Sequence, residues 1–140
     1  MAVVRERFLD TSGLYALLDR RDGHHAAARA NITPHLQAGG RLVTSDYIVA
    51  ETVNLANARG GKHIGLRILD LLEQSKGIRI EWIGRERFEA AKVFFRRHTE
   101  HAYSFTDCTS FVLMRELKLT DALTTDRHFQ QAGFRVLLRD

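Results

Sequence analysis

The chain has 140 residues, of which 44% are apolar, and this is the size and composition of one domain that closes a hydrophobic core without disulfides or structural metals. The lone cysteine, Cys108, excludes an internal disulfide and fits a reducing cytosol. No apolar run approaches the roughly 20 residues of a membrane helix, and the first residues lack a signal-peptide block. Twenty-one lysines and arginines against seventeen acidic residues give a net charge of +4, which favours a polyanionic partner such as nucleic acid. We therefore expect one cytoplasmic domain over residues 1–140.

Short apolar runs alternate with segments of helical spacing through the first half of the chain. In chain order, this pattern predicts a strand over 3–9, helices over 12–18 and 24–37, a strand over 41–44, and helices over 46–59 and 62–74. Asp22 is available to cap the second helix, whereas Pro34 favours a kink or an early end of it. Ser45 or Asp46 caps the third helix.

The second half continues the same alternation. It predicts a strand over 77–83, helices over 85–98 and 106–116, a strand over 122–124, a short helix over 127–132 and a strand over 134–138. Because strands that are separated by helices pair in parallel through crossovers, the fold class is an α/β sandwich with a helix-covered sheet.

Two acidic residues come just after predicted strands. Ligands of open parallel sheets bind outside the carboxyl ends of the strands, so Asp10 and Asp126 stand where functional side chains are expected. Each also has a structural interpretation. Asp126 can be the N-cap of the helix that follows it, and Asp10 can cap the first helix, for which Thr11 and Ser12 are also available.

A third acid, Glu51, lies on a predicted helix at spacings of three and four residues from Ile48 and Leu55. This spacing places its carboxylate along a stripe that otherwise faces the core. The alternative is an ordinary helix-forming residue at the edge of the apolar stripe.

The fourth acid, Asp107, lies in the first turn of its predicted helix, above a buried stripe that includes Phe111. The alternative is an acid that stabilises the helix through its dipole, with Ser104 or Thr106 as the cap.

If these four carboxylates converge on one cleft, they repel one another. One pair of unit charges at ~4 Å and an effective dielectric of ~20 costs about 4 kcal/mol, so several pairs rival the ~5–15 kcal/mol that holds a domain folded. Only cations or protonation make such a cluster tolerable. Oxygen ligands favour Mg²⁺ or Mn²⁺, ions that orient a phosphodiester, activate water and stabilise the leaving oxygen. The set therefore predicts metal-assisted phosphodiester hydrolysis.

Competing chemistries fail at the same positions. Residues 10–13 (DTSG) match neither a dinucleotide-binding glycine motif nor a P-loop, and Ser12 excludes the paired aspartates of an aspartyl-phosphate phosphatase. Cys108 is interpreted as a small buried apolar residue with no catalytic role.

Several basic side chains are candidates for contacts with nucleic-acid phosphates. These are Arg20, Arg21, Arg59, Lys62, Arg96, Arg97, His98, His101, Arg127 and His128. The alternative for the group at 96–101 is a solvated helix end. The neighbours His24 and His25 point ~100° apart on a helix and are interpreted as surface or local packing.

Four segments together resemble the acidic motifs of the PIN-domain ribonucleases, in the same order and spacing and over nearly the whole chain. They are FLDTSGLYALL (8–18), IVAE (48–51), SFTD (104–107) and LTTDRHF (123–129). The short chain is most similar to the VapC-type toxins of bacterial toxin–antitoxin pairs.

This resemblance implies a single PIN-like domain with a five-stranded parallel sheet of order 3-2-1-4-5, and a site for Mg²⁺ or Mn²⁺. Asp10 and Asp107 would be the principal metal ligands and catalytic residues, completed by Glu51 and Asp126. Ser12 and Thr124 match small polar positions from which a hydrogen bond can orient a carboxylate.

The implied function is a metal-dependent endoribonuclease that acts on RNA, with a homodimeric state and a cognate antitoxin. Two alternatives stay open on the sequence alone. One is a binding module for RNA or a protein partner whose acids hold a cation without turnover. The other is a nuclease that is not a toxin and acts on DNA or in RNA processing.

Overall fold

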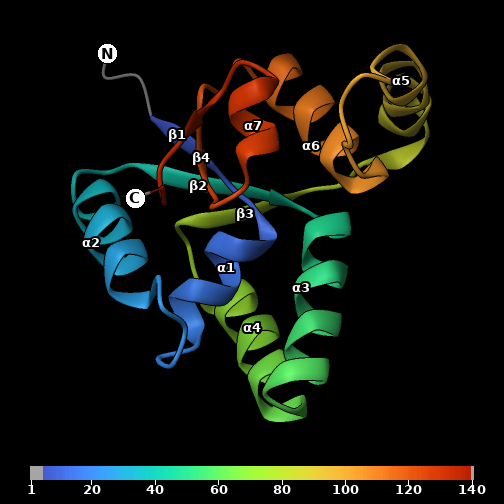
Figure 1. Ribbon diagram of the computed structural model, residues 1–140. Coiled ribbons are helices and arrows are strands. Elements are labelled where there is room, and N and C mark those ends of the chain that lie inside the picture. Colours follow the sequence, from blue (N-terminus) through green and yellow to red (C-terminus); the bar gives the residue numbers. More distant parts are fainter. Residues whose placement is uncertain (1–4, 140) are drawn as a thin grey trace.

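Five parallel strands form one sheet at the centre of the computed structural model, which describes residues 5–139 (Figure 1). The strands are β1 Glu6–Leu9, β2 Arg41–Ser45, β3 Ile78–Glu81, β4 Asp121–Leu123 and β5 Arg135–Val136. Their spatial order is β3-β2-β1-β4-β5, and every neighbouring pair runs parallel. The α/β class and the sheet order expected from the sequence are confirmed. Residues 3–4 of the predicted first strand lie outside the described residues.

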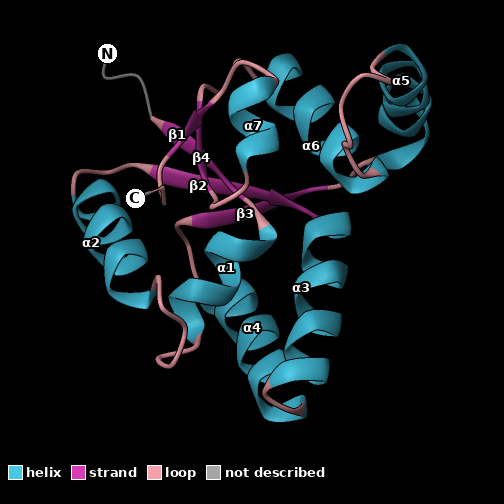
Figure 2. Cartoon of the chain, in the orientation of Figure 1, coloured by secondary structure: helices cyan, strands magenta, loops and turns pink. Residues whose placement is uncertain are grey.

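Helices cover both faces of this sheet (Figure 2). They are α1 Thr11–Leu18, α2 His25–Gln37, α3 Asp46–Arg59, α4 Lys62–Gln74, α5 Gly84–Arg97, α6 Phe105–Glu116 and α7 Arg127–Gln131. The helices α1, α2 and α4 pack on one face, and α6 and α7 on the other, with α5 against α6. Among residues 5–139, no helix combines the length and the apolarity that a membrane span requires.

The two layers arise from the alternation of side chains along the strands. In β1, Phe8 enters the apolar cluster beneath α6 and α7, and the next residue, Leu9, enters the cluster beneath α1 and α4. In β2, Val43 joins the first cluster and Leu42 the second. All four side chains are fully buried, so the central strands are apolar on both faces, as parallel sheets require.

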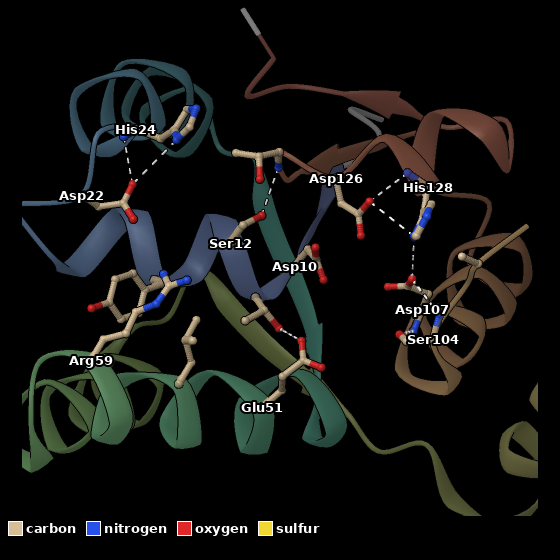
Figure 3. Close-up of a pocket in the computed structure, with 15 residues that line it drawn as sticks. Asp10, Ser12, Asp22, His24, Glu51, Arg59, Ser104, Asp107, Asp126 and His128 are labelled. Carbon is tan, nitrogen blue, oxygen red and sulfur yellow. Dashed lines mark hydrogen bonds and ion pairs between the residues drawn. The ribbon is translucent and has the colours of Figure 1, made fainter.

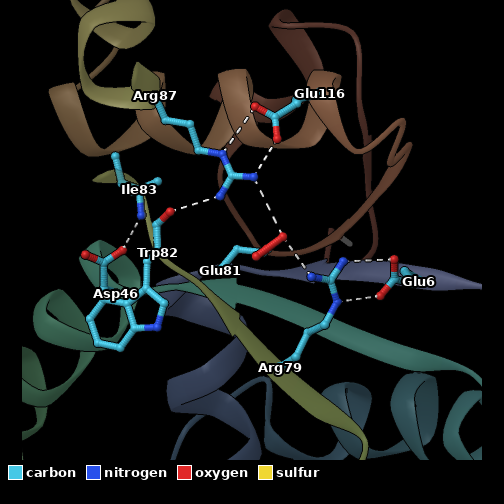
Figure 4. A network of polar contacts seen from close by, with 8 residues as sticks. All are labelled: Glu6, Asp46, Arg79, Glu81, Trp82, Ile83, Arg87 and Glu116. Carbon is cyan, nitrogen blue, oxygen red and sulfur yellow. Dashed lines mark hydrogen bonds and ion pairs between the residues drawn. The ribbon is translucent and has the colours of Figure 1, made fainter. Parts of the chain in front are cut away.

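Polar contacts terminate the edge strand β3 and tie its side chains to neighbouring residues (Figure 4). The Ile83 N–H donates to Oδ1 of Asp46 at 2.8 Å instead of extending the ladder, so β3 ends earlier than the predicted strand over 77–83. Arg79 forms ion pairs with Glu6 and Glu81, both at 2.9 Å. The predicted strand over 134–138 is likewise shortened, to β5, which lies at the opposite edge and pairs on one side only.

The predicted helices are found within one residue of their expected ends. Ser45 caps α3, its Oγ accepting from the Ile48 N–H at 3.2 Å. The early end expected at Pro34 is wrong, since α2 continues to Gln37. Pro34 lacks the N–H that would donate to the carbonyl of Ala30, but the helix continues after it, and the carbonyl of Pro34 accepts from Ala38 at 3.0 Å.

Candidate active site

All four acids predicted from the sequence line one pocket of about 620 Å³. Asp10 and Asp126 come from the connections that follow β1 and β4, Glu51 comes from α3 and Asp107 from α6 (Figure 3). The pocket opens outside the carboxyl ends of the neighbouring strands β1 and β4, where ligands of parallel sheets are expected. We call this pocket the acidic pocket.

Asp10 is the buried carboxylate of the acidic pocket. Its backbone N–H donates to the carbonyl of Leu123 at 3.3 Å and its own carbonyl accepts from Leu14 at 2.8 Å, which anchors the start of α1 to β4. The residue is only 7% exposed, and its side chain makes no capping hydrogen bond to α1. The alternative that the Asp10 carboxylate caps this helix is therefore wrong, and the carboxylate remains available to a ligand.

Two hydroxyl groups, those of Ser12 and Thr124, are hydrogen-bonded in series to this carboxylate. The Thr124 hydroxyl donates to Oδ2 of Asp10 at 2.7 Å and accepts from the Asp126 N–H at 3.0 Å. The Thr124 hydroxyl has a single proton, which it donates to Asp10. In the 3.2 Å contact between Ser12 Oγ and Thr124 Oγ1, Ser12 is therefore the donor. Ser12 Oγ in turn accepts from the Thr125 N–H at 3.0 Å. These contacts fix the position of the Asp10 carboxylate relative to β4.

Asp107 and Asp126 both have the structural roles that the sequence allowed. Ser104 caps α6: its Oγ accepts from the Asp107 N–H at 3.0 Å, and Oδ2 of Asp107 accepts from the Ser104 N–H at 3.1 Å. Asp126 caps α7, since its Oδ1 accepts from the His128 N–H at 2.9 Å. A carboxylate has several acceptor sites, so each cap leaves oxygen lone pairs directed at the acidic pocket.

His128 joins these two acids, a contact that the sequence did not predict. Its Nδ1 lies 3.1 Å from Oδ2 of Asp107 and 3.5 Å from Oδ1 of Asp126. The ring also meets Tyr103 edge-on at 5.3 Å between centroids. From the sequence, His128 is only one of the basic candidates, because its approach to Asp107 depends on how α6 and α7 pack.

Glu51 lines the acidic pocket but does not face the core, and the expectation that it lies along the buried stripe is wrong. Ile48 and Thr52 are buried, whereas Glu51 is exposed. The adjacent face of α3 borders the pocket instead of the sheet. The Thr11 hydroxyl donates to Oε1 of Glu51, so a side chain of α1 fixes this carboxylate at the pocket wall. The sequence predicts Thr11 only as a possible cap of α1, not as a partner of Glu51.

Burial dominates the electrostatics of the acidic pocket. It raises the pKa of Asp10 from 3.8 to about 7; the hydrogen bond from Thr124 opposes this rise, and the charges of Asp107 and Glu51 add to it. Burial also raises the pKa of Asp107, to which the charge of Asp126 contributes. Without a cation, these aspartates therefore stay protonated in the folded protein at pH values where the same residues of the unfolded chain are ionised.

This raised pKa predicts that Asp10→Asn stabilises the metal-free protein in a pH-dependent way. Below pH 3.8 Asp10 is protonated in both states and costs nothing; between pH 3.8 and 7 only the unfolded state ionises, so the folded state progressively loses stability, up to about 4 kcal/mol above pH 7. We measure the free energy of unfolding by urea in EDTA. We expect this free energy to be several kcal/mol higher for Asp10→Asn than for the wild type at pH 8, and nearly the same for both proteins at pH 4. Asp70→Asn, on the exposed face of α4, is the matched control. If Asp10→Asn raised the free energy of unfolding equally at both pH values, the raised pKa of Asp10 would be contradicted.

The donor set fits a divalent cation. One ligand atom each of Asp107, Asp126 and His128 lies within 4.8 Å of the other two. Two atoms bound to one ion at ~2.1 Å are at most ~4.2 Å apart, so side-chain shifts of a few tenths of an ångström bring all three to one ion. Asp10 and Glu51 add oxygen donors that line the same pocket. Carboxylate oxygens suit Mg²⁺ and Mn²⁺, and the imidazole nitrogen adds a donor that transition metals accept.

Of the basic candidates, the structure places Arg59 and His128 in the acidic pocket. His24, which was interpreted as surface or local packing, lines it as well. His98 instead stacks on Phe94 at 4.2 Å and His101 on Tyr103 at 4.8 Å between ring centroids.

The sheet order together with the acidic pocket at its carboxyl edge defines a PIN domain. The sequence profile of the PIN domain matches residues 7–135, and the chain belongs to this family.

Within the family, the expected likeness to VapC toxins is confirmed. The chain is 33% identical over 130 residues to the 23S rRNA-specific endonuclease VapC20 of Mycobacterium tuberculosis, in strains CDC 1551 / Oshkosh and H37Rv, an alignment that covers 91% of this chain and 94% of VapC20. The crystal structure of VapC20, described as a sarcin–ricin loop cleaving toxin, superposes with a TM-score of 0.79 at 32% identity, covering 91% of this chain and 95% of that one.

Two more distant structures share the fold. VapBC2 from Rickettsia felis, bound to a DNA fragment from its promoter, has a TM-score of 0.68 at 11% identity and covers 94% of this chain and 96% of the other. FitAcB from Neisseria gonorrhoeae has a TM-score of 0.65 at 17% identity, and the superposition covers 93% of this chain and 95% of the FitAcB chain.

Proposed function

We propose that this protein is a metal-dependent endoribonuclease that hydrolyses RNA phosphodiester bonds as the toxin of a toxin–antitoxin pair. The observation that carries the proposal is the convergence of Asp10, Glu51, Asp107 and Asp126 on one pocket in a chain with a net charge of +4. The relationship to VapC20 supports the choice of RNA as substrate.

In this proposal the acids hold Mg²⁺ or Mn²⁺. Asp10 and Asp107 are the principal ligands, Glu51 and Asp126 complete the cluster, and His128 is a further donor beside Asp107. When bound, the cation lowers the pKa of an attacking water and offsets charge on the scissile phosphate. This role also explains why the fold tolerates a buried aspartate whose pKa burial raises to about 7.

The surrounding side chains position these donors. Thr124 and Ser12 hold the Asp10 carboxylate, and Thr11 holds Glu51 across the acidic pocket. His128 fixes Asp107 against Asp126. Positions set by several hydrogen bonds lower the reorganisation that a transition state would otherwise require.

We propose 23S rRNA as the target, supported by the identity with VapC20 over 91% of the chain. An antitoxin partner is supported by the structural neighbours VapBC2 and FitAcB. We also retain the expectations of a homodimer, a cytoplasmic location and one domain over residues 1–140; the single sheet that spans residues 6–136 supports the last of these.

The test is cleavage of RNA by the purified protein. Intact ribosomes, naked 23S rRNA, a single-stranded oligonucleotide and a tRNA are each incubated with Mg²⁺, with Mn²⁺ and with EDTA, and the new 5′ ends are mapped by primer extension. We expect cuts in 23S rRNA that need a divalent cation. Cuts confined to tRNA would change the proposed target, and intact RNA in every tube, together with cation-dependent stabilisation, would favour the non-catalytic binding module.

A further inference from the structure

The acidic pocket has a second end, which carries basic groups. It is formed by Tyr15 of α1, by Asp22 and His24 in the turn before α2, and by Arg59 at the end of α3. Figure 3 shows Arg59 and His24 on the side of the pocket opposite Asp107, Asp126 and His128. We call this set of four residues the arginine end.

Arg59 is the available cation of the arginine end. Its guanidinium carbon lies 5.7 Å from the centre of the Tyr15 ring. Among residues 5–139, no carboxylate lies within ion-pair distance of it, although nine other arginine and histidine side chains of this range are so paired. Its N–H groups are therefore free to bind an anion.

Tyr15 gives the guanidinium a fixed support. The ring is only 4% exposed, and its hydroxyl donates to Oδ2 of Asp19 at 2.8 Å. Asp19 is itself held by the Arg21 N–H at 2.9 Å. A ring this buried cannot stack on a nucleobase. At the arginine end, the group that can contact RNA is therefore the Arg59 guanidinium above the ring.

The one acid at this end is already engaged. Oδ1 of Asp22 accepts from the His24 N–H at 2.8 Å and lies 3.8 Å from Nδ1 of His24. The Asp22 carboxylate thus stabilises the turn before α2 and leaves the Arg59 guanidinium unpaired.

We propose that Arg59 binds a backbone phosphate of the RNA strand farther along the acidic pocket than the phosphate that is cleaved. This inference rests on the proposed function. A strand with one of its phosphates among Asp10, Asp107 and the cation must continue along the acidic pocket, where Arg59 is its available cationic group. Guanidinium presents paired N–H donors that match phosphate oxygens, and such contacts position a nucleic acid without reading its sequence.

The test measures RNA binding in a cleavage-silent background. Asp107→Asn protein in Mg²⁺ is titrated with a labelled single-stranded RNA by fluorescence anisotropy at several KCl concentrations, with and without Arg59→Gln. We expect Arg59→Gln to weaken binding about tenfold and to lower the slope of log affinity against log salt by ~0.7, the loss of one phosphate contact. Arg59→Lys keeps the charge and should retain the slope.

Arg67→Gln is the matched control, because Arg67 is an exposed arginine of α4 outside the acidic pocket and its loss changes the net charge equally. An equal effect of Arg67→Gln, or weaker binding by Arg59→Gln at an unchanged salt slope, overturns the inference. Failure of the Asp107→Asn parent to bind RNA, or of the wild type to cleave it, overturns the proposed function itself. Binding by the parent with no effect of Arg59→Gln overturns only the role of Arg59.

Discussion

Asp107→Asn is expected to lower RNA cleavage by about a thousandfold, equivalent to about 4 kcal/mol of transition-state stabilisation, while the chain stays folded. Activity is lost because an amide is a poor ligand for a divalent cation in place of an ionised carboxylate. The fold is retained because the amide oxygen can still accept from the Ser104 N–H and keep the cap of α6. Removing one of four clustered charges also relieves repulsion in the metal-free protein.

The measurement is the initial rate of cleavage with Mn²⁺ or Mg²⁺, with the melting temperature recorded with and without the cation. We expect the wild type to melt at higher temperature when the cation is added and the variant to respond less, because a ligand stabilises the state that binds it. Asp70→Asn, purified identically, controls for loss of one negative charge and for contaminating nucleases. A metal-dependent Asp107→Asn enzyme with the wild-type rate would exclude Asp107 as a ligand.

The positions of Asp10 and Asp126 could be predicted because each lies just beyond the carboxyl end of a strand, Asp10 directly after β1 and Asp126 three residues after β4. Alternation of apolar runs with helical segments fixes a parallel sheet, and the carboxyl ends of adjacent parallel strands lie at one edge. The sequence therefore places both acids at one edge, where the structure finds them. The caps Ser45 and Ser104 were similarly predictable, since capping depends on residues three apart.

The environment of Glu51 and the contact of His128 depend on tertiary packing. The helical period says which residues share a face of α3, but whether the face beside the buried stripe meets the sheet or the acidic pocket depends on where α3 lies. His128 and Asp107 are 21 residues apart on different helices, and their 3.1 Å contact follows from the packing of α6 and α7. The raised pKa of Asp10 likewise follows from burial by elements distant in the sequence.

Packing of α1 against β4 is the tertiary contact on which the acidic pocket depends most closely. Gly13 lies so near this strand that a Cβ atom there would stand 2.1 Å from the carbonyl oxygen and 2.8 Å from the carbonyl carbon of Leu123. These are backbone atoms of a central strand and cannot move aside as a flexible side chain could. Residues 10–12 precede Gly13 on the same segment, so the approach that requires a glycine also brings Ser12 to Thr124.

Gly13→Ala is therefore expected to destabilise the protein by about 3 kcal/mol, a value at the upper end for overpacked sites, and to lower its melting temperature by about 10 °C. Gly23→Ala is the matched control, because a Cβ at Gly23 meets nothing within 4 Å, and its stability should change by less than about 0.5 kcal/mol. Both variants are compared by thermal and urea unfolding, with RNA cleavage measured well below the melting temperature. We expect Gly13→Ala to cleave more slowly even when folded, since displacement of α1 separates the hydroxyl chain from the Asp10 carboxylate. Equal stability of the two variants would show that α1 shifts without cost, and full activity of Gly13→Ala would show that the contacts of Ser12 and Thr124 are not needed to hold Asp10 for catalysis.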